Sequence, residues 1–149
     1  MIIVDLDGTI ADCSHRLHLI QGDKKDWNAF YKACKDDKPI ERVLSIVNTL
    51  EEYHDLVFIT GRSEICREET YEWLDKNSYM TCSELLMRKE GDFRPDTEVK
   101  KELLDEYLNK NNMNCDYDSV EMVFEDRSSV VKMWRELGLT VCQVAEGDF

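Results

Sequence analysis

The sequence has 149 residues, of which 42% are hydrophobic and 34% charged, and its formal net charge is −13. This length and composition are typical of one globular domain with a packed core. The negative charge excludes a protein that coats nucleic acid through a broad basic surface, because affinity for phosphodiester backbones depends largely on lysine and arginine. The longest apolar runs, 1–4 and 56–59, are too short for a membrane-spanning helix.

The six cysteines form no Cys-x-x-Cys pair, and no signal peptide precedes the first apolar run. Scattered cysteines of this kind favour reduced thiols over a zinc site or a disulfide framework. We therefore expect a cytoplasmic protein without a membrane partner, and a single domain over residues 1–149.

Strand-like runs alternate with helix-like patterns along the chain. Apolar runs predict strands at about residues 2–6, 55–60, 83–88, 120–125 and 140–144. Alternating strands and helices form a parallel sheet with helices on both faces. The sequence therefore predicts an α/β fold, a Rossmann-like three-layer sandwich with a parallel sheet of about five strands.

Three helices are predicted from apolar residues at helical spacing, across 40–50, 103–108 and 130–137. Ser63 and Asp96 are predicted N-caps, since their side chains accept hydrogen bonds from the first free amides of a helix. Gly138 is predicted to end the last helix.

The stretch at about residues 10–39 is unusually long, and Pro39 closes it. Ligands of open α/β sheets bind beyond the carboxyl ends of the strands, so this insertion is predicted to form a small helical cap over the site. Trp27, Phe30 and Tyr31 share helical spacing within it. We expect them to form the core of the cap, with a base-stacking platform as the alternative.

Asp5 and Asp7 follow the first apolar run directly, in the sequence Asp-Leu-Asp-Gly-Thr. One interpretation is ordinary turn chemistry after a strand. The other is a phosphoryl-transfer site, in which one aspartate attacks phosphorus and the other manages the proton of the leaving group.

Three later segments favour the second interpretation. The run Thr60-Gly61-Arg62 ends a predicted strand with groups suited to phosphate oxygens, and Lys100 lies in the first turns of a predicted helix. The adjacent carboxylates Glu125-Asp126 end a fourth predicted strand and suit an oxygen-loving cation such as Mg²⁺.

The order Asp-x-Asp-Gly-Thr, Thr-Gly-Arg, Lys and Glu-Asp resembles the motifs of the haloacid dehalogenase superfamily of phosphohydrolases. Arg16, Arg94, the run 125–135 and the ending 142–149 are similar to the phosphatase half of bacteriophage polynucleotide kinase/phosphatase. Glu125 departs from that family, which has aspartate there, but keeps the charge. No Gly-x-x-x-x-Gly-Lys-Ser/Thr motif occurs, so we expect no phosphorylation of 5′ ends by this chain.

The resemblance implies that Asp5 is the nucleophile and forms an aspartyl-phosphate, while Asp7 is the general acid and base. It also implies a Mg²⁺ site formed by Asp5, Asp126 and the backbone carbonyl of Asp7, with Glu125 as an outer carboxylate. An aspartate with an ordinary pKa of about 3.9 is a poor acid at neutral pH. The pKa of Asp7 is therefore expected to be raised by burial or by a neighbouring carboxylate.

In the same resemblance, Thr60 holds the phosphoryl oxygens and Lys100 neutralises their charge. The residues implied to contact substrate are Arg16, Gly61, Arg62, Arg94, Asp96 and Arg127. Two alternatives stay open: Asp96 caps its helix or orients Lys100, and Arg127 stabilises the acidic pair rather than touching substrate.

The function expected from this resemblance is Mg²⁺-dependent removal of the 3′-phosphate from DNA or RNA ends. A separate kinase or ligase of a repair pathway is a possible partner. The first alternative is a phosphatase of small phosphorylated metabolites, such as nucleoside monophosphates, which suits the acidic charge. The second is a non-catalytic phosphate-binding module.

Overall fold

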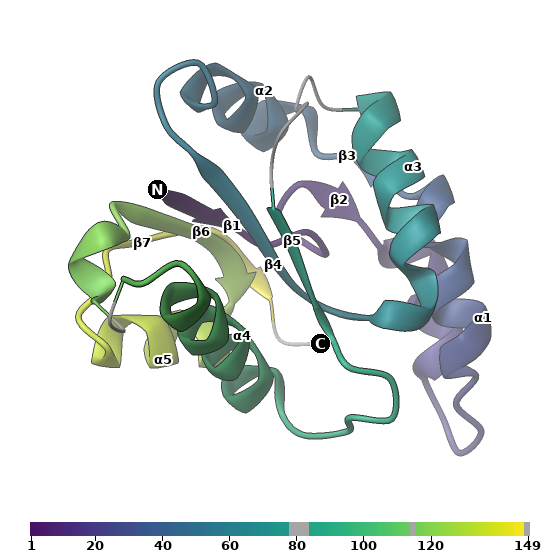
Figure 1. The fold of residues 1–149 in the computed structure, drawn as a ribbon. Helices are drawn as coiled ribbons and strands as arrows, with labels where there is room; N and C mark the ends of the chain where they lie inside the picture. The colour runs from purple at the N-terminus through teal and green to yellow at the C-terminus, as the bar shows by residue number, and fades with distance from the viewer. Residues whose placement is uncertain (78–83, 114–115, 148–149) are drawn as a thin grey trace.

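The computed structural model describes residues 1–77, 84–113 and 116–147 (Figure 1). Its centre is a five-stranded sheet in the order β5-β4-β1-β6-β7, and all neighbouring strands are parallel. The strands are β1 (Ile2–Val4), β4 (Leu56–Ser63), β5 (Glu84–Arg88), β6 (Met122–Arg127) and β7 (Val141–Gly147). The predicted α/β fold is confirmed, although β1 ends before the predicted residue 6 and residue 83 lies outside the described residues.

Helices cover both faces of the sheet and enclose two cores, because successive residues of a strand point to opposite faces. Ile2 and Val4 of β1 pack with helices α2 (Glu41–Leu50) and α3 (Arg67–Asn77). Ile3 packs on the other face with α4 (Asp96–Lys110) and α5 (Ser128–Glu136). Figure 1 shows α4 and α5 together on one side of the sheet.

The segment between β1 and α2 contains short elements. Two short strands, β2 (Ala11–Asp12) and β3 (Lys38–Pro39), form an antiparallel pair. Between them lie the 3₁₀ helix η1 (Ser14–Ile20), the helix α1 (Trp27–Lys32) and the 3₁₀ helix η2 (Ala33–Asp36). The predicted helix around Trp27 is therefore present.

The helix ends agree with two of the three predicted caps. Ser63 accepts a hydrogen bond from the Ile65 amide and caps the 3₁₀ helix η3 (Glu64–Cys66). Gly138 follows α5 with a φ of +88°, the left-handed conformation that glycine adopts without steric cost. The predicted cap at Asp96 is wrong, because Pro95 is the N-cap residue of α4 and the Asp96 side chain binds arginines instead.

Two of the three strands that lead into the predicted motifs, β4 and β6, are irregular at their carboxyl ends. The register between β4 and β5 shifts between Thr60 and Ser63, and that between β6 and β7 shifts between Glu125 and Arg127. Such bulges bend a strand and re-aim its side chains. A further 3₁₀ helix, η4 (Tyr117–Ser119), precedes β6. Among the described residues, no helix is both long and apolar enough to span a bilayer.

Candidate active site

The predicted catalytic residues meet at the carboxyl edge of the sheet. Because β1 lies between β4 and β6, Asp5 after β1 has Thr60 on one side and Asp126 on the other. The Asp5 amide donates to the Phe124 carbonyl at 3.0 Å, which extends the pairing with β6. A cavity of about 730 Å³ lies over this edge, lined by Asp5, Asp7, Thr60, Lys100 and Asp126 among others. This edge is where ligands bind in open parallel sheets.

Lys100 is the cation at the floor of the cavity. Its Nζ donates to Asp5 Oδ1 and to Glu125 Oε2, both at 2.7 Å, and the three side chains are almost fully buried. Burial and repulsion from Glu125 raise the pKa of Asp5 to about 7, although Lys100 opposes the shift. Burial alone would discharge Lys100, but the two carboxylates outweigh it and raise the pKa of the ammonium group. Lys100 therefore stays charged beside Asp5.

Three buried carboxylates could hold a divalent cation. One oxygen from each of Asp5, Glu125 and Asp126 lies within 4.8 Å of the others. Asp126 Oδ2 is buried and has no hydrogen-bond partner among the described residues, so it is available as a ligand. Burial and the Asp5 charge raise the pKa of Asp126 to about 6, which a cation would reverse. This all-oxygen donor set fits Mg²⁺.

Asp7 is held by two arginines. Its Oδ1 accepts from Arg16 Nη2 at 2.6 Å, and from Arg62 Nε and Nη2 at 2.9 and 2.5 Å. Burial opposes ionisation, but the two guanidinium groups outweigh it and lower the pKa of Asp7. The expectation of a raised Asp7 pKa is therefore wrong for this state of the site, since Asp7 has cationic rather than carboxylate neighbours.

The same arginines bind a residue that sequence reasoning missed, Asp37, which is buried at the end of η2. Asp37 accepts from Arg16 through both carboxylate oxygens at 2.7 Å, and from Arg62 Nη2 at 2.8 Å. Trp73 Nε1 donates to the Asp37 carbonyl at 2.7 Å and fixes its backbone. Asp37 belongs to no motif and lies in a run of charged residues, so only its burial and contacts reveal it.

The predicted substrate contact of Arg16 disagrees with the structure. The Arg16 side chain has no exposed surface and is not part of the cavity lining. Its guanidinium group lies 4.2 Å from the centre of the Phe30 ring and is otherwise occupied by Asp7 and Asp37. Arg16 therefore supports Asp7 in this structure instead of facing a ligand.

Gly61 and Asp96 pack directly against each other. A Cβ atom at Gly61 would lie 2.8 Å from Asp96 Oδ1, a distance that real side chains do not tolerate. Asp96 in turn binds Arg88 and accepts from Arg127 Nη1 at 2.5 Å, and Arg88 Nε donates to the Gly61 carbonyl. The alternative that Asp96 orients Lys100 by direct contact is not supported, because its carboxylate is occupied by the arginines.

Thr60 and Arg94, two further predicted site residues, also line the cavity. Thr60 is buried, and its hydroxyl accepts from the Arg62 amide at 3.2 Å. Arg94 is exposed at the mouth and pairs with Asp92 and Glu102, each at 2.6 Å. Thr9 donates to Asp5 at 3.1 Å and to Asp126 at 3.4 Å, so it fixes the carboxylates across the β1–β6 edge.

Comparison with known proteins agrees with this geometry. The sequence matches the family model of the polynucleotide kinase PNKP phosphatase domain over residues 1–149. A polynucleotide kinase/RNA ligase of Autographa californica nuclear polyhedrosis virus is 31% identical over 142 residues, which cover 91% of this chain and 18% of the viral protein. The chain thus spans less than a fifth of that relative.

Solved structures show the same fold. A chain of the Pnkp1/Rnl/Hen1 RNA repair complex is 31% identical with a TM-score of 0.76, and the match covers 99% of this chain and 43% of that one. A haloacid dehalogenase family enzyme of Bacteroides thetaiotaomicron, solved with magnesium and inorganic phosphate, is 13% identical with a TM-score of 0.55 over 99% of this chain and 95% of its own. The resemblance found in the sequence is confirmed. The chain belongs to the polynucleotide kinase PNKP phosphatase domain family and has the fold of the haloacid dehalogenase enzymes.

Proposed function

We propose that this chain is a Mg²⁺-dependent phosphomonoesterase that removes the 3′-phosphate from DNA or RNA ends through an aspartyl-phosphate on Asp5. The observation that carries the proposal is the pairing of Asp5 with the buried Lys100 ammonium beside the carboxylates of Glu125 and Asp126. A charged lysine next to a carboxylate lets that anion approach the anionic phosphoryl group.

In the proposed reaction, a carboxylate oxygen of Asp5 attacks phosphorus, and the bond from phosphorus to the terminal 3′ oxygen breaks. Asp7 gives the departing oxygen a proton. Asp7 then takes a proton from water, which attacks the aspartyl-phosphate, releases inorganic phosphate and regenerates Asp5. Mg²⁺ held by Asp5, Asp126 and the Asp7 carbonyl, with Glu125 beside it, would neutralise phosphoryl charge when bound.

The two arginines set the protonation of Asp7 in this scheme. Paired with Arg16 and Arg62, Asp7 is ionised and ready to act as the base. To act as an acid, Asp7 must have a higher pKa. We propose that Arg62 gives up part of its hydrogen bonding to Asp7 and donates to the substrate phosphoryl group instead, which raises the Asp7 pKa. Both arginines bind Asp37, but Arg62 lines the cavity and Arg16 does not, so Arg62 is the one proposed to make that exchange.

The non-bridging oxygens of the phosphoryl group are proposed to bind the Thr60 hydroxyl and the backbone amides of Gly61 and Arg62. The bulge at the end of β4 supports this, because it interrupts the strand pairing at these residues. Arg94 and Arg127, at the rim of the same cavity, are proposed to contact the nucleic acid. Asp96 positions Arg127 and Arg88. Segment 10–39 is proposed to serve as the cap of a single cytoplasmic domain, with DNA or RNA ends as substrate.

A kinase or ligase partner is proposed from the relatives, since one is named a polynucleotide kinase/RNA ligase and another comes from an RNA repair complex.

The experiment that tests the function compares 3′-phosphate, 5′-phosphate and 2′,3′-cyclic phosphate ends on matched DNA and RNA oligonucleotides, with a 3′-mononucleotide alongside. We expect Mg²⁺-dependent release from 3′-phosphorylated oligonucleotides. Preference for 5′ ends or for the mononucleotide would contradict the proposed substrate.

A further inference from the structure

Two aromatic side chains from separate segments line the mouth of the catalytic cavity. Trp27 is the first residue of α1, and Phe93 lies in the loop between β5 and α4. Their residues are 38% and 87% exposed, and neither belongs to the two hydrophobic cores. Figure 1 shows the loop after β5 running below the sheet toward the side where α1 lies. Both rings are therefore accessible to a ligand in the cavity.

Trp27 is held in place although it is exposed. Its ring lies 5.9 Å from the ring of Phe30 in an edge-to-face arrangement, and 5.9 Å from the tilted ring of Tyr31. Phe30 is buried, and the Arg16 guanidinium lies over its ring. The predicted cap core is therefore present at Phe30, whereas Trp27 rests on it with an open side. A ring fixed in advance loses little conformational entropy when a ligand stacks on it.

The charges beside these rings suit a nucleic acid rather than an uncharged apolar ligand. Lys25 Nζ lies 5.9 Å from the centre of the Trp27 ring, and Arg94 follows Phe93 in the chain. Both cations line the cavity, in a chain whose net charge is −13. Aromatic side chains interleaved with cations form the platforms on which proteins stack unpaired bases.

We propose that Trp27 and Phe93 bind the terminal nucleobase of the 3′-phosphorylated strand while its phosphate lies over Asp5. The inference rests on the proposed function and adds to it a base subsite, which distinguishes nucleotide ends from other phosphomonoesters. The cavity is continuous from Asp5 to both rings, so one nucleotide occupies the catalytic floor and the aromatic mouth together.

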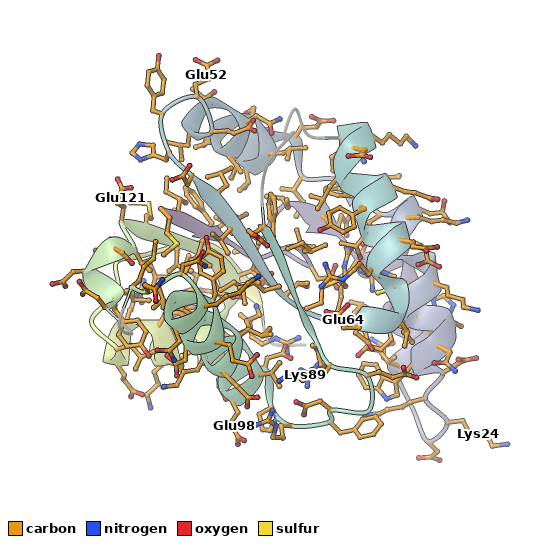
Figure 2. All side chains as sticks on the ribbon, in the orientation of Figure 1. Lys24, Glu52, Glu64, Lys89, Glu98 and Glu121 are labelled. Atoms are coloured by element: carbon orange, nitrogen blue, oxygen red, sulfur yellow. The ribbon has the colours of Figure 1, made fainter. Side chains whose placement is uncertain are left out.

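The test compares two oligonucleotides that share a 3′-phosphate, one with an ordinary terminal nucleotide and one with an abasic terminal sugar. We expect the wild-type protein to favour the base-bearing end in kcat/KM by roughly 5- to 150-fold, the range for stacking one base on an aromatic residue. In Trp27→Ala and Phe93→Ala this preference falls toward unity, and in Trp27→Phe most of it remains. Tyr53→Ala is the matched control: Tyr53 is 78% exposed, lines no part of this cavity and follows Glu52, labelled in Figure 2 far from Lys24.

Each outcome decides between the claims. Equal turnover of both oligonucleotides by the wild type, or an unchanged preference in both alanine variants, overturns the base subsite and leaves the phosphatase proposal standing. Absence of turnover on both oligonucleotides overturns the proposed function, and the subsite with it.

Tryptophan emission supplies a second readout that does not require turnover. The chain has three tryptophans, and Trp73 and Trp134 are 1% and 0% exposed, so Trp27 reports on the cavity. We expect the base-bearing 3′-hydroxyl product to quench emission and to protect Trp27 from acrylamide, while the abasic product does neither. The Trp27→Phe variant is expected to lose the response. Protection by the abasic product equal to that by the base-bearing one overturns the proposal.

Discussion

The carboxylates of Asp7 and Asp37 are joined through the same two guanidinium groups, those of Arg16 and Arg62, at distances of 2.5 to 2.9 Å. Asp37 comes from the long segment after β1, whereas Asp7 belongs to the catalytic edge. Asp37 therefore fixes the arginines that set the charge on Asp7. The site is built from a buried network of two anions and two cations, and the removal of one member leaves an unbalanced charge.

The first prediction concerns Asp37→Asn. Loss of one buried negative charge leaves Arg16 and Arg62 under-compensated, so we expect the free energy of unfolding in urea to fall by about 3–5 kcal/mol. We also expect the limb of the kcat–pH profile that reports on Asp7 to move to lower pH. Without Asp37, the two arginines turn more fully to Asp7 and lower its pKa further. Asp36→Asn, at the exposed neighbouring position, is the control and should match the wild type. Equal stability of the two variants would contradict the network.

The second prediction concerns Lys100→Met, a substitution of similar length without charge. Since Lys100 is the buried cation that contacts Asp5, its loss should lower kcat by roughly 10²- to 10³-fold, the usual effect of removing one donor that stabilises transition-state charge. Lys101→Met removes a half-buried lysine outside the cavity, which pairs with Asp105, and should leave kcat near wild type. Comparable kcat values for the two variants at saturating Mg²⁺ would remove Lys100 from the mechanism.

The third prediction concerns the contact between Gly61 and Asp96. Gly61→Ala pushes the Asp96 carboxylate away from Arg88 and Arg127, and we expect kcat to fall roughly 100-fold, as small displacements in active sites do. The clash requires the Asp96 side chain. In a protein that already carries Asp96→Ala, Gly61→Ala should therefore lower kcat much less than it does in the wild type. If the two substitutions lower kcat by fully additive free energies, the steric explanation is refuted.

The fourth prediction concerns pH and metal. Burial and repulsion from Glu125 raise the pKa of Asp5 to about 7, and burial and repulsion from Asp5 raise that of Asp126 to about 6, above their ordinary values of about 3.9 in an unfolded chain. A raised folded-state pKa stabilises the protein at low pH, and this stability is lost as pH rises through about 6 to 7. In EDTA, the melting temperature should thus be higher at pH 5 than at pH 8.

Mg²⁺ should act in the opposite direction, because it binds the ionised carboxylates and so raises the melting temperature more at pH 8 than at pH 5. Asp126→Asn should reduce both effects, whereas Asp118→Asn, at an exposed position, should preserve them. If the melting temperature in EDTA changes with pH to the same extent in the wild type and in Asp126→Asn, the assignment of the pH effect to these buried carboxylates is contradicted.

The sequence predicts those parts of the site that depend on strand ends. Asp5, Thr60 and Asp126 follow apolar runs, and parallel pairing brings the ends of such runs to one edge of a sheet, so their meeting follows from pattern alone. Lys100 is predictable for a similar reason, since α4 begins next to that edge.

Other parts depend on tertiary packing. Asp37 and Phe93 lie in segments without periodicity, and only the folded chain brings them to the site. The Asp7 pKa is set by Arg16 and Arg62, whose direction toward Asp7 is not encoded in local spacing. The cap predicted at Asp96 failed because ion pairing with two arginines competes with helix capping.

The central claim is that Asp5 is the nucleophile of a phosphatase. An oligonucleotide carrying a radiolabelled 3′-phosphate, mixed with the Mg²⁺-loaded protein and quenched in acid within one turnover, tests it most directly. We predict that label appears on a single peptide containing Asp5, and that Asp5→Asn forms no labelled peptide and releases no phosphate while keeping the wild-type fold by circular dichroism. Phosphate release by Asp5→Asn at an appreciable fraction of the wild-type rate would contradict the account.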